Sequence, residues 1–343
     1  GNTSVGFETL LVDVNGDSST AVGYQALKTQ NGINGTVANT AIGRDALTRL
    51  TTGTMNTAVG YLSQDYNRTG INNTSVGKES LSQLGHDDSD NNTAVGFQAM
   101  RSAGTPNNND AAQNVAVGSK ALTAILDGDN NVAVGYLAGA AITTGEGNNV
   151  IGMSAGDALT TGILNTVVGY YALSTSTDVD RVVAIGTEAM ESGNVTSAAD
   201  GTIAIGSKAL QVLTSGGANV AIGKESGKAL TTGAHNTFVG TTTGDDMVEG
   251  SYNIAIGSDA LGGAKDGTAD ASQFNIFIGV NSGNGDWVTA VSQYNVGIGS
   301  YTLDGAMNGA TNNVAVGHLA LSAITTGDAN VSLGSEAGES INT

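Results

Sequence analysis

Polar and hydrophobic residues alternate in one short motif that returns along the whole chain. The motif reads Asn-Val-Ala-Val-Gly at 131–135, and nineteen copies of it occur with small changes. The closing glycines are 17 residues apart in eleven of eighteen steps and 18 to 22 apart in the others. A short period sustained from end to end is typical of a solenoid, in which each repeat forms one coil. We therefore expect a single elongated domain over residues 1–343, although length alone suggests two or three.

Each copy predicts a short strand that ends at its glycine. Counted from that glycine as position 0, position −4 is Asn in sixteen copies and position −1 is always Val, Ile or Leu. Position −2 is usually Ala, and position −3 is Thr in the first six copies and mostly Val or Ile afterwards. This is the period-2 pattern of a strand. We expect the β-branched face to be buried and the small Ala face to meet another surface closely.

The asparagines and glycines of the motif have expected structural roles. Asn131 and Asn236 fit a turn that enters the strand, and stacked asparagines can form a hydrogen-bonded ladder from coil to coil. Val134 ends its strand, and Gly135 and Gly240 close their copies. Position +3 is always Ala, Ser or Thr and position +4 most often Leu, Met or Gly, which predicts a second short strand or turn with its Leu in the core.

The length of the repeat defines the fold class. A 17-residue unit is too short for a helix plus a strand pair, and it suits one coil with two short strands and two turns. Stacked coils lie about 4.8 Å apart, so eighteen steps predict a rod of roughly 85–90 Å. One coil cannot bury its own apolar face, and its neighbours must do so. The expected fold is an all-β parallel β-solenoid of about 19 coils with 17–22 residues each.

The motif Asn-x-Ala-Val/Ile-Gly followed by x-x-Ala-Leu resembles the head repeat of trimeric autotransporter adhesins, the YadA-like head, and similar repeats of phage tail fibres. The resemblance covers Asn2 to about Gly338. It implies a left-handed β-roll and an intertwined or side-by-side homotrimer. The Ala face is compatible with a tight contact between the subunits of such a trimer. A 17-residue coil exceeds the shortest coils of these heads, so larger outer turns are expected.

Composition narrows the range of partners. The net charge is −19, and twelve Lys and Arg over nineteen coils make no basic stripe, which argues against nucleic acid and anionic membrane surfaces. The sequence contains no run of 18 apolar residues, so it predicts no membrane span. It also contains no Cys, which excludes disulfides. Neither end shows a polar cap, so we expect a segment of a longer fibre with neighbouring segments stacked on both ends.

Five insertions between position +4 and the next Asn should project from one edge of the stack. Loops on a rigid scaffold are common binding sites. We predict ligand contacts at Asp286 and Trp287, the only tryptophan, and at Arg101 and Asn108. The alternatives are tolerated surface insertions and a Trp that packs its own loop down. The insertions lie within 28–38, 101–113, 191–201, 262–273 and 283–293.

Two further patterns suggest binding chemistry. Asp13, Asn15 and Asp17 alternate as oxygen ligands do in a calcium loop, without its Gly at position six or its Glu at position twelve. A solvated turn is the alternative to a Ca²⁺ site, and no other cofactor is expected. Aromatic residues recur at position +1, where they form either sugar platforms or packing contacts between coils: Phe7, Tyr24, Tyr61, Phe97, Tyr136 and Tyr170.

The pattern favours an adhesive fibre over an enzyme. Cys is absent, and three histidines at different phases of the repeat form no catalytic constellation with Ser and Asp. We predict an extracellular trimeric rod from a phage tail fibre or bacterial surface adhesin, which binds a host-surface glycan or protein through multivalent contacts. One alternative is a scaffold filament that binds only its own kind. Another is a fibre-borne glycan hydrolase with an acidic pair such as Asp245 and Asp246.

Overall fold

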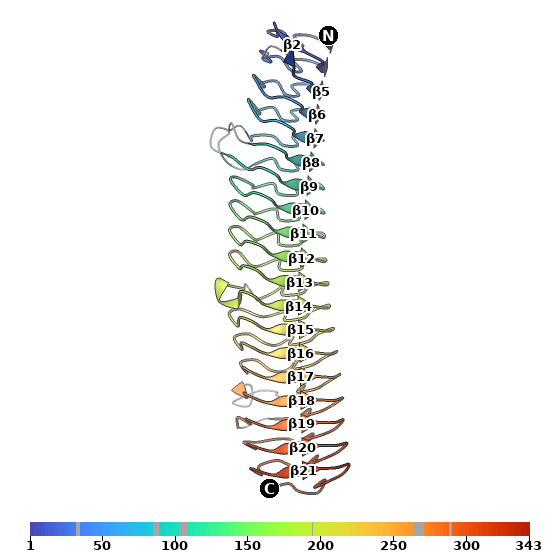
Figure 1. Ribbon diagram of the computed structural model, residues 1–343, viewed down its shortest axis with the longest axis vertical. Helices are drawn as coiled ribbons and strands as arrows, with labels where there is room; N and C mark the ends of the chain where they lie inside the picture. The colour runs from blue at the N-terminus through green and yellow to red at the C-terminus, as the bar shows by residue number, and fades with distance from the viewer. Residues whose placement is uncertain are drawn as a thin grey trace. The chain divides into compact units, whose positions relative to one another are not determined.

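The computed structural model describes residues 1–31, 35–84, 89–102, 104, 109–193, 195–263, 271–287 and 290–343. It is an all-β parallel β-solenoid of about 19 coils, as the repeat predicts (Figure 1). The only helix in the described part is one 3-10 turn, η1, at Ser197–Ala199. The chain divides into two compact units, Gly1–Val168 and Gly169–Thr343.

In the first unit one strand per coil covers positions −3 to −1. Each strand pairs in parallel with those of the neighbouring coils, and the same repeat positions lie opposite each other, such as Ala41 and Ala58. The strands are β1 (Thr3–Val5), β3 (Thr20–Val22), β5 (Thr40–Ile42), β6 (Thr57–Val59), β7 (Thr74–Val76), β8 (Thr93–Val95), β9 (Val115–Val117), β10 (Val132–Val134), β11 (Asn149–Ile151) and β12 (Thr166–Val168). A separate short parallel pair joins β2 (Gly16–Asp17) to β4 (Gly35–Thr36).

The second unit repeats this arrangement with the same register. Ala184 lies opposite Ala204, for example, and Ala204 opposite Ala221. Figure 1 shows these strands following one another in chain order. They are β13 (Val183–Ile185), β14 (Ile203–Ile205), β15 (Val220–Ile222), β16 (Thr237–Val239), β17 (Ile254–Ile256), β18 (Ile276–Ile278), β19 (Val296–Ile298), β20 (Val314–Val316) and β21 (Val331–Leu333).

The strand faces are the reverse of the prediction. The central residue at position −2 is buried, as at Ala21 and Ala133, whereas position −1 is 39% exposed at Val76 and 38% at Ile256. The expectation of a buried β-branched face and an outward Ala face is therefore wrong. The coil is thin, and inside it the strand faces the residues at positions +3 and +4, so the inner face holds Ala in most coils and a larger side chain in a few, such as Val167. The branched side chains fit the pleated outer surface instead.

The core consists of three further columns of side chains, at positions +3, +4 and +7. The Leu at position +4 is fully buried, as predicted, in Leu27 and Leu47, and it packs with Ala26 and Ala46 at position +3. Position +7 contributes a column that the motif did not indicate: Leu50, Leu84, Ile125, Ile142, Leu159, Leu213, Leu230, Met247 and Ile324.

The closing glycine is required by the close approach of successive coils. Gly135 has φ of +140°, and a Cβ added there would lie 2.4 Å from the carbonyl oxygen of Gly152 in the next coil. Both the dihedral angle and the contact exclude a side chain. The closing position is therefore fixed by the spacing of the stack.

The predicted asparagine ladder is confirmed. The backbone N–H of Asn131 donates to Oδ1 of Asn114 at 2.8 Å, and its Nδ2 donates to the carbonyl of Gly145 at 2.8 Å. Its own Oδ1 accepts the backbone N–H of Asn148 at 3.0 Å. Asn236 repeats these contacts in the second unit. Each asparagine thus satisfies buried backbone groups of both its own coil and the adjacent one.

Two coils exchange a large residue for a small one in a compensated way. Phe238 stands at position −2 in place of Ala, and Gly244 stands at +4 of the same coil in place of Leu. A Cβ at Gly244 would lie 2.9 Å from the Phe238 ring. Phe277 and Gly283 form a second such pair, at 2.7 Å. The core volume of each coil is therefore conserved while its residues change.

This compensation is testable by a double-mutant cycle. Phe238→Ala leaves a cavity and should lower the free energy of unfolding by about 3–5 kcal/mol. Gly244→Leu should also destabilise, because the new side chain meets the ring. The double variant restores the common Ala–Leu pair and should recover most of both losses in urea unfolding followed by circular dichroism. Simple additivity of the two losses would contradict the packing described here.

Adjacent asparagines allow a matched test of the ladder. Asn131→Ala removes the acceptor of a buried N–H and the donor to Gly145, and each buried group left unpaired costs about 1–3 kcal/mol. Asn130→Ala is the control, because Asn130 is exposed and Ala218 occupies the same repeat position elsewhere. The first variant should have a clearly lower melting temperature than the second. Equal melting temperatures would mean that the ladder contributes little.

Candidate binding surfaces

The two predicted contact residues of the 283–293 insertion, Asp286 and Trp287, differ in their exposure to solvent. Asp286 is exposed. Trp287 is fully buried and packs edge-on against Phe277, with 5.6 Å between ring centroids and 68° between planes. Its indole N–H has no hydrogen-bond partner among the described residues. The ring thus fills the interior of its coil, which was the alternative to a ligand contact, and only Asp286 offers a polar group at the surface.

The other predicted loop contacts lie in the first unit. Arg101 has its Nε 3.6 Å from Oε2 of Glu79, whose carboxylate also accepts a hydrogen bond from Gln98 at 2.8 Å. The hydrogen bond from Gln98 is the main cause that lowers the pKa of Glu79, with the Lys78 and Arg101 charges adding to it. Asn108 lies outside the described residues. Arg101 is therefore placed on a surface with an ion-pair network.

In the candidate calcium loop, the first carboxylate, that of Asp13, accepts hydrogen bonds from other groups of the protein. Oδ1 of Asp13 accepts the backbone N–H of Gly16 at 3.0 Å, and Oδ2 accepts Nδ2 of Asn2 at 2.8 Å. Asp17 accepts the hydroxyl of Ser18 at 3.1 Å through its side chain. No group of three or more His, Asp or Glu in the described ranges is placed to hold a metal ion. The observed contacts are those of a hydrogen-bonded Asp turn.

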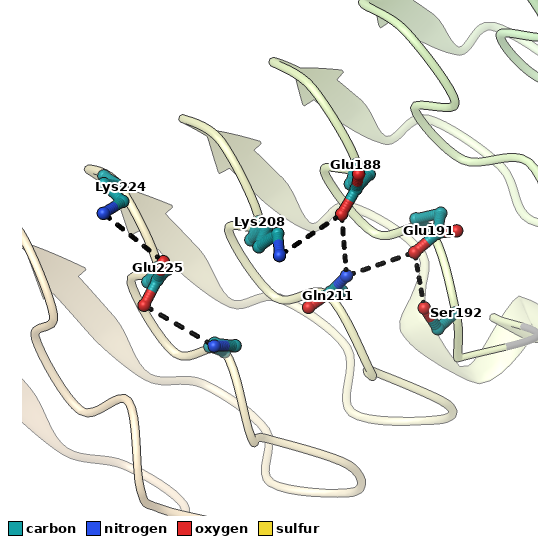
Figure 2. A network of polar contacts seen from close by, with 8 residues as sticks. Glu188, Glu191, Ser192, Lys208, Gln211, Lys224 and Glu225 are labelled. Carbon is teal, nitrogen blue, oxygen red and sulfur yellow. Dashed lines mark hydrogen bonds and ion pairs between the residues drawn. The ribbon is translucent and has the colours of Figure 1, made fainter.

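Polar side chains form a local network on neighbouring coils of the second unit (Figure 2). Gln211 donates from Nε2 to Glu188 at 3.2 Å and to Glu191 at 3.1 Å, and Lys208 pairs with Glu188 at 3.5 Å. In the next coil, Glu225 lies 3.5 Å from the ammonium groups of both Lys224 and Lys228. The contacts of Gln211 and Lys208 link two successive coils, whereas those of Glu225 lie within one coil.

A shallow cavity of about 320 Å³ adjoins this network. Position +5 of three successive coils supplies Gln211, Lys228 and Asp245, and the next position supplies Val212, Ala229 and Asp246. Burial, with the Asp246 carboxylate next in effect, raises the pKa of Asp245 to about 6. The acidic pair noted in the sequence thus lies beside an amide and a cation, a set of groups that both donates and accepts hydrogen bonds.

The aromatic column at position +1 is interleaved with cations. Phe7 stacks on Tyr24, with centroids 5.3 Å apart, and the Arg44 guanidinium lies 5.5 Å from Tyr24 and 5.7 Å from Tyr61. Lys78 continues the column at 5.8 Å from Tyr61 and also approaches the ring of Phe97. The rings therefore pack between coils, which is one of the two predicted roles, and they remain partly exposed.

A second aromatic column escaped the sequence analysis. Position −5, the residue before the ladder Asn, is aromatic in four successive coils: His235, Tyr252, Phe274 and Tyr294. These rings stack with centroids 4.9, 5.0 and 5.2 Å apart and planes within 14° of parallel. Reading the repeat column by column would have shown it, since the four residues share one phase. Insertions of different lengths between the copies hide that phase from a linear reading.

Comparison with known proteins gives no family for this chain. No protein-family model matches it, and no curated protein matches it either. Within the described ranges there is no helix with the length and apolarity of a membrane span. The function must therefore be argued from the surfaces themselves.

Asp245 predicts a pH dependence of stability. Its raised pKa means that the folded state disfavours the ionised carboxylate, so this residue costs stability as the pH rises from about 4 through 6. Asp245→Asn removes that cost and should raise the melting temperature at about pH 7.5 relative to wild type, with no such gain at about pH 4. Scanning calorimetry at both pH values measures this. A gain of equal size at both would show that the charge is not responsible.

Proposed function

We propose that this chain is a structural and adhesive fibre segment, a left-handed trimeric β-solenoid rod of a phage tail fibre or bacterial surface adhesin. It would act outside the cell and bind a host-surface glycan or protein. The observation that carries the proposal is the outer face of the strands. In all nineteen copies positions −3 and −1 hold no charged residue, and many of these side chains are exposed, such as Ile42 at 41% and Ile298 at 40%.

Such a face fits a second copy of the same chain. Contiguous apolar patches beyond a few hundred Å² mark interaction sites on soluble proteins. This face repeats every 4.8 Å or so, and a partner with the same repeat matches it row by row. The Ala face assigned to the trimer contact from sequence is buried inside the coil. We therefore assign the contact to the β-branched rows.

The asparagine ladder and the parallel strand pairing support the mechanical part of the proposal. Within each unit, parallel backbone pairing ties successive coils together and asparagine amides reinforce most of these links, which makes a stack resist bending. Three such stacks side by side would carry each surface feature three times. Repeated presentation raises the avidity of individually weak contacts.

Light scattering tests the assembly directly. We expect a solution mass near three times 34.0 kDa. The double variant Ile256→Lys/Ile298→Lys places charges on the outer rows and should reduce the mass to one chain while the circular dichroism spectrum stays that of the wild type. Thr241→Lys is the matched control, because position +1 already carries Lys224 in the preceding coil. A monomeric wild type would refute the trimer, and a ladder of larger species would favour an end-to-end filament.

A further inference from the structure

The cavity beside the polar network of the second unit has an apolar end and an acidic end. Its volume of about 320 Å³ is at the small end of the range for ligand sites, so it admits one small group. Val212 and Ala229, at position +6 of two successive coils, line the apolar end. Asp245 and Asp246, in the third coil, line the acidic end. Two coil spacings, roughly 9.6 Å, separate Val212 from Asp246.

Negative charge exceeds positive charge at the acidic end of the cavity. Burial is the main cause that raises the pKa of Asp245 to about 6, and the carboxylates of Asp246, Asp259 and Glu225 raise it further. Lys228 also lines the cavity, but its ammonium group lies 3.5 Å from Glu225, whose charge it offsets. A cation bound beside Asp245 would favour the ionised form of this half-buried carboxyl group and would be attracted to its neighbours as well.

An apolar surface that leads to a carboxylate matches the side chain of lysine or arginine. Such a side chain consists of a methylene stem and a cationic head, and it buries the stem on apolar surface while the head keeps its polar contacts. Val212 and Ala229 would pack against the stem, and Asp245 would accept a charge-assisted hydrogen bond from the head. A neutral sugar would leave the carboxylates without a counter-charge, and an anionic sugar would be repelled.

The charge of the surrounding chain favours the same class of partner. Residues 169–343, which form the second unit, include seventeen Asp and Glu against five Lys and Arg. A surface with this excess of carboxylates attracts a basic protein over a distance and repels an acidic glycan. The long-range field and the cavity therefore both select a positively charged side chain.

We propose that the cavity lined by Val212, Ala229, Asp245 and Asp246 binds a lysine or arginine side chain of a protein receptor. The stem of that side chain packs on the apolar end, and its head pairs with Asp245. The inference rests on the proposed adhesive function, and it narrows the receptor from a glycan or protein to a protein with an exposed basic residue. Three copies of the cavity in a trimer would raise the avidity of a contact that is weak by itself.

Small probes test the cavity before a receptor is known. Nα-acetyl-lysine N-methylamide is the cationic probe, the norleucine analogue has the same stem without the charge, and methyl glucoside represents a neutral sugar. Saturation-transfer NMR titrations with the wild-type protein measure weak binding of each probe. We expect the lysine probe to bind at least about tenfold more tightly than the other two, because only its head forms a charge-assisted hydrogen bond.

Two variants with matched controls locate the site. Asp245→Asn removes the charge at nearly constant size, and Asp157→Asn is its control, because Asp157 is also partly buried at the same repeat position of the first unit. Ala229→Leu fills the apolar end without a change of charge, and Ala141→Leu is its control in the first unit. Asp245→Asn and Ala229→Leu should each bind the lysine probe at least about tenfold more weakly, and both controls should bind it as the wild type does. Circular dichroism and light scattering check the fold and mass of each variant.

Equal binding of the lysine and norleucine probes would overturn the inference, and so would unchanged binding of the lysine probe by Asp245→Asn. Tighter binding of the glucoside than of the lysine probe would assign the cavity to a sugar instead. A glycan array and a panel of intact cells test the adhesive function in parallel. Adhesion of the wild type that Asp245→Asn fully retains would overturn the receptor role of the cavity and leave the adhesive function intact. Failure of the wild type to adhere to any glycan or cell would refute the adhesive function itself.

Discussion

The parallel backbone pairing between successive coils is the constraint on which the rest of this molecule depends. It fixes the distance from one coil to the next at about 4.8 Å. At that distance the closing glycine cannot carry a side chain, because its Cβ would overlap the carbonyl group of the next coil. The same distance lets one asparagine amide reach the backbone of two coils at once. The Gly and Asn that recur from copy to copy are therefore the residues that this distance between coils requires.

The spacing also converts repeat positions into columns of side chains. Residues at the same repeat position of successive coils lie next to each other, so aromatic rings stack, cations lie between rings, and Lys208 pairs with Glu188 of the preceding coil. The interior columns are restricted in volume, as the Phe–Gly pairs show. The exterior columns are free to vary, and there the coils differ most in chemistry. Function in such a protein is therefore expected in the outer columns and in the insertions beside them.

The proposed trimer contact and the stacked rings of the second unit use different columns of the same coils. The outer strand rows are uncharged, with Val, Ile or Leu at position −1 and Thr, Val or Ile at most −3 positions, which suits a permanent contact with a copy that has the same repeat. Position −5 carries four stacked rings in the second unit, apart from those rows. One short motif thus provides rows for the proposed assembly and a separate column of exposed rings.

The sequence by itself determined the coil, its strand, the parallel stack, the asparagine ladder and the buried Leu, because a period repeated nineteen times leaves little freedom in register. Only the tertiary structure decided which strand face is buried. Alternation defines two faces, but the thinness of the coil, which admits Ala21 inside and leaves Val76 outside, arises from the path of the whole turn. It likewise decided that Trp287 fills the core and that four rings of equal phase meet, since inserted loops shift the spacing along the chain while folding restores the columns in space.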